Sequence, residues 1–188
     1  MPGCSNESKW DFNNPAGYHA LSQLKDTEIK YYLIAGNNPE ELRKQMDHLG
    51  VLDLYGKRRD AYTKWHLTWS WPTDANQNPE FDKTTSKIKF TINLPKWLPE
   101  SGVSNELHEK WIGFYRAMLD HEYNHVKLAL AQASKVSEAV RKRFQQNPNL
   151  EIDQAHQAAK AVVRQMYQAD SEYDQKTQSG KLEGVVFP

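Results

Sequence analysis

The chain has 188 residues, of which 24 are basic and 24 are acidic, so its formal net charge is zero. This balance gives no electrostatic reason to expect a nucleic acid or an anionic membrane surface as the partner. The length suits one domain with a substantial core, and six Trp and nine Tyr argue against a disordered chain. No apolar run approaches the roughly 20 residues that a membrane-spanning helix needs.

Residues 1–27 are rich in Asn, Ser, Pro and Gly, and we expect them to form a flexible N-terminal arm. Cys4 is the single cysteine, so no disulfide can form within the chain. The run Gly3-Cys4-Ser5-Asn6 resembles the end of a bacterial lipoprotein signal, although no hydrophobic stretch precedes it. On this interpretation the native protein is secreted or periplasmic and attached to a membrane through a lipidated Cys4. The alternative is an N-terminal Cys without a role.

The folded domain is expected to span residues 28–188 and to begin with a strand over 28–34. A helix is predicted next, from Pro39 to Leu49. Asn38 before it is a good N-cap, and Gly50 after it is a good terminator.

Two further strands are predicted from strict alternation of apolar and polar residues. The apolar positions are Trp65, Leu67, Trp69 and Trp71 in the first strand, and Ile88, Phe90, Ile92 and Leu94 in the second. This period of two is typical of an antiparallel sheet with one packed face and one solvated face. Residues 73–86 between the strands are polar and predict a long loop, and Pro95 and Pro99 are expected to stop the second strand.

Two long helices are predicted in the C-terminal half of the chain. The first runs from about 105 to 146, and a break at Asn147-Pro148-Asn149 separates it from the second, over about 151–176. The expected fold class is therefore α+β, with a small antiparallel sheet packed on two long antiparallel helices.

The segment with the clearest chemistry is His121-Glu122-Tyr123-Asn124-His125, inside the first long helix. Two His four residues apart project from one face and can hold one zinc ion through imidazole nitrogens. Glu122 lies beside that face, where it can take a proton from water that zinc has acidified. This is the His-Glu-x-x-His pattern of the zincins. The motif therefore implies that the α+β fold is zincin-like.

The two histidines also interrupt a mostly apolar stripe that advances by alternating steps of four and three residues, through Leu107, Trp111, Phe114, Met118, His121, His125, Leu128 and Gln132. Buried imidazoles need polar partners, and a shared metal ion satisfies both. The alternatives are a pair of hydrogen-bonded core histidines or a solvated motif without function.

A catalytic zinc site needs a third protein ligand, and the second long helix offers candidates. Asp170 and Asp174 lie four residues apart near its end, so one can bind zinc while the other orients an imidazole N–H. Periodicity does not choose between them, and either can be a surface carboxylate. Tyr173 can donate its hydroxyl to a developing oxyanion, or it can be a packed aromatic residue. His156 is a further candidate ligand, but it lies about four turns away from Asp170.

From about Ile29 to Pro188 the chain resembles a bacterial family of predicted secreted zinc-dependent proteases, catalogued as domain of unknown function 922. The residues that carry the resemblance are Gly36, Glu40-Glu41-Leu42, Ala61-Tyr62-Thr63-Lys64-Trp65 with Trp69, Leu94-Pro95-Lys96-Trp97, the His121-Glu122-x-x-His125 motif, Tyr173-Asp174-Gln175-Lys176-Thr177, Gly180, Gly184 and Pro188.

The resemblance implies zinc ligation by His121 and His125 and a catalytic role for Glu122. The family often has a His immediately before the Gly that matches Gly180, whereas this chain has Ser179. That departure increases the weight on Asp170 and Asp174 as the third ligand, and it leaves open an inactive member.

The sequence therefore predicts a zinc-dependent hydrolase, most simply a metallopeptidase acting on a protein or peptide. One alternative is a binding module of the cell envelope that lacks catalysis and either contains zinc or is free of metal. Another is a hydrolase that acts on a different amide bond, such as one in the cell wall.

Overall fold

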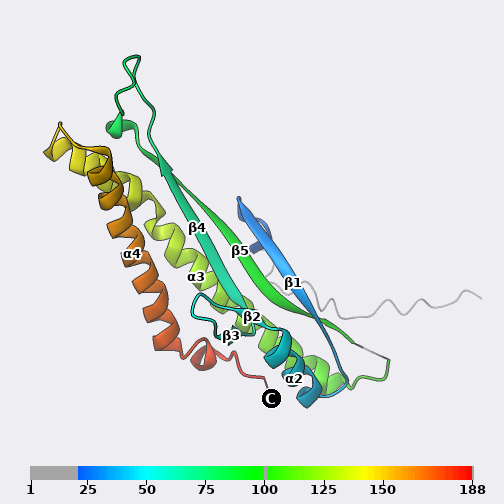
Figure 1. The fold of residues 1–188 in the computed structure, drawn as a ribbon. Helices are drawn as coiled ribbons and strands as arrows, with labels where there is room; N and C mark the ends of the chain where they lie inside the picture. The colour runs from blue at the N-terminus through cyan, green and yellow to red at the C-terminus, as the bar shows by residue number, and fades with distance from the viewer. Residues whose placement is uncertain (1–20, 100, 188) are drawn as a thin grey trace, which may run out of the picture.

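The computed structural model describes residues 21–99 and 101–187. The fold is α+β, as predicted, and the elements follow one another along the chain as Figure 1 shows. They are β1 (Thr27–Ala35), α2 (Pro39–Leu49), β2 (Val51–Leu52), β3 (Arg58–Arg59), β4 (Tyr62–Ser70), η1 (Phe81–Lys83), β5 (Thr85–Leu98), α3 (Asn105–Gln146), α4 (Ile152–Thr177) and η2 (Lys181–Glu183). Each predicted strand and helix is present. Asn38 caps α2 by accepting a hydrogen bond from the Glu41 backbone N–H.

The main sheet has three strands in the order β1-β5-β4. The prediction of an antiparallel sheet is correct for β4 and β5 but wrong for β1, which runs parallel to β5. Alternation of apolar and polar residues reports which face of a strand is buried, and it carries no information about the direction of the neighbouring strand. A second, two-stranded antiparallel sheet pairs β2 with β3 to form a hairpin.

Of the two prolines predicted to stop this strand, Pro95 does not, because β5 continues to Leu98, whereas Pro99 follows directly after the strand. Tyr62, the first residue of β4, is opposite Asn93, so β5 has a neighbour on one side only beyond that point. Pro95 pairs in register with Tyr32 of β1. A strand with one open side tolerates the missing N–H of proline.

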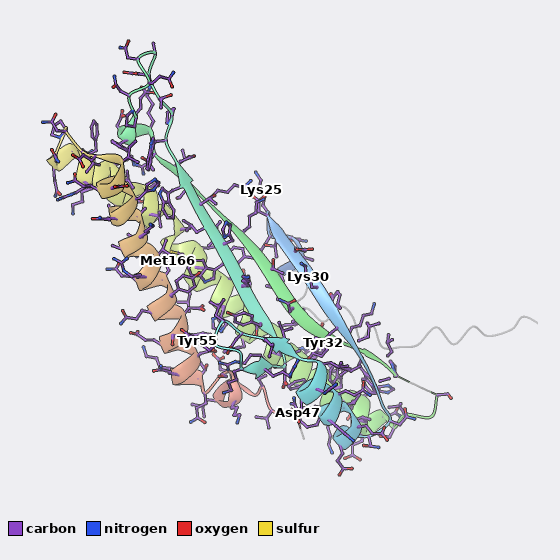
Figure 2. The ribbon with its side chains drawn as sticks, in the orientation of Figure 1. Lys25, Lys30, Tyr32, Asp47, Tyr55 and Met166 are labelled. Atoms are coloured by element: carbon purple, nitrogen blue, oxygen red, sulfur yellow. The ribbon has the colours of Figure 1, made fainter. Side chains whose placement is uncertain are left out.

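The helix α3 runs along β4 and β5 and beside α4, as Figure 1 shows, and it contacts all three elements. α4 also reaches β4 directly, because the rings of Trp65 and Tyr167 stack. The buried stripe on α3 agrees with the prediction as far as His125 and then continues through Val126, Ala129, Val136 and Val140. On α4 the buried positions include Ala155, Ala159 and Met166, and Met166 is labelled in Figure 2. This packing fixes the rotation of both helices about their axes, and therefore the direction of their polar side chains.

The folded part of the chain begins before residue 28, because Leu21 is fully buried in the core and β1 begins at Thr27. The rest of the expected arm, with Cys4, lies outside the described residues. Across the described residues, no helix is both long enough and apolar enough to cross a membrane.

Candidate metal centre

The two histidines of the motif lie near the middle of α3. The helix begins after Ser104, whose side chain accepts a hydrogen bond from the Leu107 backbone N–H. Because His121 and His125 lie one turn apart, they project from the same face, toward α4. Both are buried, with relative exposures of 5% and 7%.

Three donor atoms converge where α3 faces the C-terminal part of α4. The Nε2 atoms of His121 and His125 lie 3.2 Å apart. Oδ1 of Asp174 lies 3.2 Å from the first and 3.3 Å from the second. These three side chains can hold a metal ion.

The other nitrogen of each imidazole contacts a different carboxylate. Nδ1 of His125 lies 2.7 Å from Oδ1 of Asp170, and Nδ1 of His121 lies 2.7 Å from Oε2 of Glu183. A carboxylate accepts the Nδ1–H in such a pair, which leaves the Nε2 lone pair for a metal ion. The structure thus gives the two candidate aspartates different places: Asp174 faces the point of convergence, and Asp170 lies behind His125.

This arrangement fits a bound cation. With both Nδ1 atoms donating to carboxylates, two imidazole lone pairs and one carboxylate oxygen face one another at 3.2–3.3 Å. At such short distances three acceptor atoms repel one another, unless a proton or a metal ion lies among them. The donor set of two imidazoles and a carboxylate is one that divalent transition metals use in proteins.

The site holds charge even without a metal ion. Burial lowers the pKa of His125, but hydrogen bonding to Asp170 and Asp174 outweighs burial and raises this pKa to about 10. Burial raises the pKa of Asp174, but hydrogen bonds from His121 and His125 outweigh it and hold this pKa far below its usual range. In the metal-free protein His125 is therefore protonated and Asp174 is ionised, and a metal ion would displace the proton of His125.

Glu122 is buried beside the histidines, with a relative exposure of 4%. Its Oε2 accepts a hydrogen bond of 2.5 Å from the hydroxyl of Thr63 on β4. Burial raises the pKa of Glu122, and the neighbouring His125 opposes that rise. The carboxylate is thus held in one orientation, and its basicity is higher than that of a solvated Glu.

A cavity of about 940 Å³ opens onto these groups, and its lining includes His121, Glu122, His125 and Asp174. The β2–β3 hairpin and the loop that joins its strands form another part of the wall, where Tyr55 is 86% exposed. Figure 2 labels Tyr55 on this hairpin, which extends from the end of α2 toward the C-terminal part of α4. The candidate metal-binding group is therefore open to molecules in solution.

Tyr173 packs against the histidines of the site, and its hydroxyl is bonded to two neighbouring side chains. Its ring stacks on that of His121, with centroids 5.1 Å apart, and its hydroxyl donates to Glu183 at 2.8 Å while accepting from Asn124 Nδ2 at 2.8 Å. Tyr173 does not line the cavity. Its contacts support the Glu183 carboxylate that holds His121.

His156 lies far from the metal-binding group, near the start of α4. Its Nδ1 accepts a hydrogen bond of 3.0 Å from the indole N–H of Trp69. The structure thus does not bring this candidate ligand to the site. Its contacts are those of a packed histidine between helix and sheet.

Three residues of the site were not found from the sequence. Thr63 could have been found, because it shares the inward period-two face of β4 with Trp65. Glu183 and Arg59 follow no periodic pattern that points to α3. Arg59 donates to the hydroxyl of Ser179, which stands where the resembling family often has a His.

The fold and the site together define a class: an α+β protein with a solvent-accessible His-His-Asp group that can hold a metal ion. Residues 29–181 match the family described as "Bacterial protein of unknown function (DUF922)", and because the match covers most of the chain, the protein belongs to that family. No curated protein and no solved structure matches the chain.

Proposed function

We propose that this protein is a zinc-dependent hydrolase, most simply a peptidase, in which Glu122 is the general base. The observation that carries the proposal is the convergence of His121 Nε2, His125 Nε2 and Asp174 Oδ1 at 3.2–3.3 Å beside a buried carboxylate. The family description names no activity, so the proposal depends on the chemistry of these side chains.

Zinc suits this group better than a hard cation such as magnesium does. Magnesium prefers six oxygen ligands, whereas zinc takes two imidazoles and one carboxylate in catalytic sites. In a tetrahedral zinc site with bonds of about 2.0–2.2 Å, neighbouring ligand atoms lie about 3.3–3.6 Å apart. The observed spacings of 3.2–3.3 Å are close to that value.

The number of ligands favours catalysis over a structural role. Among the described residues the group comprises three side chains, whereas structural zinc is usually held by four. A bound zinc ion with three protein ligands supplies Lewis acidity at its open position, where it polarises water and a carbonyl group. The cavity gives substrate access to that position.

Each neighbouring residue has a definite task in this proposal. Glu122 accepts the proton of the attacking water, whose oxygen adds to the carbonyl carbon, and then passes that proton to the departing amine as the C–N bond breaks. Thr63 orients the Glu122 carboxylate through its hydroxyl. Asp170 and Glu183 hold the imidazoles with Nε2 toward the cavity.

The proposed substrate is a protein or peptide, because the cavity wall combines polar groups with exposed apolar side chains. Leu54 is 58% exposed and Tyr55 is 86% exposed on the hairpin wall. We further propose that the native protein acts outside the cytoplasm. That part of the proposal depends on the sequence around Cys4 alone.

The test combines metal content with turnover. Protein purified without added metal is expected to contain about one zinc per chain by mass spectrometry, and His121→Ala is expected to lose it. Zinc-loaded Glu122→Gln is expected to keep the metal while hydrolysis of casein or a peptide library falls at least about 100-fold. Glu172→Gln is the matched control, because that carboxylate is on the exposed face of α4 and bonds to Gln168. Equal turnover in Glu122→Gln and wild type would refute the proposed mechanism.

A further inference from the structure

Arg59, on β3, is held at two points of its guanidinium group. Nε donates to Oδ2 of Asp53 at 2.8 Å, and Nη1 donates to Oγ of Ser179 at 2.6 Å. Asp53 belongs to the hairpin, whereas Ser179 follows α4. The two contacts come from parts of the chain about 120 residues apart and fix the plane of the group.

The third nitrogen of Arg59 points toward the metal-binding group. Nη2 lies 3.8 Å from Oδ2 of Asp174, whose other oxygen faces the two histidines. That distance is longer than a hydrogen bond, so the Nη2 protons remain able to bind another oxygen. The side chain is 21% exposed and lines the cavity.

The other arginines of the cavity wall are directed elsewhere. Arg43 is paired with Asp47 and Asp60, and Arg58 donates to the carbonyl oxygen of Gly50. Arg59 is thus distinguished from them by its contact with a member of the metal-binding group. The hydroxyl of Tyr173 is engaged with Glu183, so it does not compete for this function.

We propose that Arg59 is a catalytic residue that binds the oxyanion in the hydrolysis proposed above. As the water oxygen adds to the carbonyl carbon, the π electron pair moves onto the carbonyl oxygen, and Nη2 of Arg59 donates a hydrogen bond to that oxygen. A donor fixed before the reaction stabilises the developing charge without reorganising. The inference rests on the proposed function, and Asp53 and Ser179 provide the fixed orientation.

The test compares Arg59→Gln with Arg58→Gln in zinc-loaded protein. Both changes remove one charge from neighbouring residues that line the same cavity. Three quantities are measured: zinc content, the dissociation constant of phenylphosphonate by calorimetry, and kcat and KM for a peptide substrate. Phenylphosphonate is a tetrahedral anion that is not turned over, so it reports anion binding without catalysis.

Arg59→Gln is expected to keep its zinc, to bind phenylphosphonate about 10- to 100-fold more weakly, and to lose about 100-fold in kcat with little change in KM. Arg58→Gln is expected to change each value less than about threefold. Equal effects of the two variants, or loss of zinc from Arg59→Gln, would overturn the proposal.

If Arg59→Gln does not fold, Ser179→Ala is the variant to measure instead, because it removes one of the two contacts that orient the guanidinium group of Arg59. It is expected to weaken phenylphosphonate binding and to lower kcat in parallel, and wild-type values for both would overturn the proposal. If wild type binds phenylphosphonate through Arg59 but cleaves no peptide, the anion site stands and the proposed function fails.

Discussion

Nδ1 of His121 donates a hydrogen bond of 2.7 Å to Oε2 of Glu183, although the two residues are 62 positions apart in the chain. Glu183 lies in η2, in the segment that follows α4. Its carboxylate also accepts a hydrogen bond from Tyr173, so the segment after α4 helps to determine which nitrogen of His121 faces the cavity. The candidate metal centre therefore depends on residues well outside the His-Glu-x-x-His motif.

The different places of Asp170 and Asp174 predict different effects on zinc affinity. Asp174→Ala removes a ligand atom, whereas Asp170→Ala removes the acceptor that orients His125. We expect Asp170→Ala to weaken zinc binding about 10- to 100-fold, as is usual when a residue that orients a metal ligand is removed. We expect Asp174→Ala to weaken zinc binding at least about tenfold further, because it removes a ligand. Competition with a chromophoric chelator measures both. Glu172→Ala, on the exposed side of the same helix, should leave the affinity unchanged, and the reverse order for the two aspartates would contradict the assignment.

Tyr173→Phe separates two tasks for this residue. If Tyr173 supports Glu183, as its hydrogen bond indicates, the variant should bind zinc more weakly while kcat of the zinc-saturated protein stays within about threefold of wild type. If Tyr173 instead stabilised an oxyanion, kcat would fall about 100- to 1000-fold at full zinc occupancy. Turnover measured over a range of free zinc concentrations distinguishes these outcomes.

Local patterns in the sequence were sufficient to predict the helices and the helix face that carries the two histidines. The spacing of His121 and His125 and the apolar stripe around them come from one helix, where a period of 3.6 residues determines which side chains share a face. Asp170 and Asp174 were both identified as candidates for the same reason. Their division into ligand and orienting group required the packing of α4 on α3, because that packing determines the rotation of one helix against the other.

Contacts between distant segments were not predictable in this way. The parallel pairing of β1 with β5, the bond between His121 and Glu183, and the approach of Arg59 to Asp174 join segments that no periodic pattern relates. The alternation on β4 reaches Thr63 only when it is extended two residues before Trp65, and the Glu122 carboxylate as its partner follows only from the position of α3 against the sheet.

Zinc affinity is expected to depend on pH because of His125. Hydrogen bonding to Asp170 and Asp174 outweighs the opposite effect of burial and raises the pKa of His125 to about 10. Below that pH the metal-free protein carries a proton on His125, which zinc must displace. The apparent affinity should therefore rise about tenfold per pH unit for each displaced proton between about pH 6 and about pH 8. Calorimetry in buffers of different ionisation enthalpy measures the proton release directly, and a flat affinity with no released proton would show that His125 is already neutral.

Gly180 lies against His121, and its replacement tests how closely the turn after α4 must approach that histidine. Its φ is +81°, a conformation that favours glycine, and an added Cβ would lie 2.6 Å from Cγ2 of Val185 and 3.1 Å from Cγ of His121. Gly102 is a matched control, because its φ is +90° and no atom lies within 4 Å of the position of an added Cβ.

Ala at either position meets a backbone penalty of about 1–2 kcal/mol in the free energy of unfolding, and only Ala at 180 also crowds its neighbours. Gly180→Ala should therefore be the more destabilising change in chemical denaturation, and it should weaken zinc binding, whereas Gly102→Ala should leave zinc binding unchanged. Equal losses of stability in the two variants, with zinc affinity unaltered in both, would contradict this prediction. The turn would then be able to move away from His121 and accommodate the methyl group without disturbing the site.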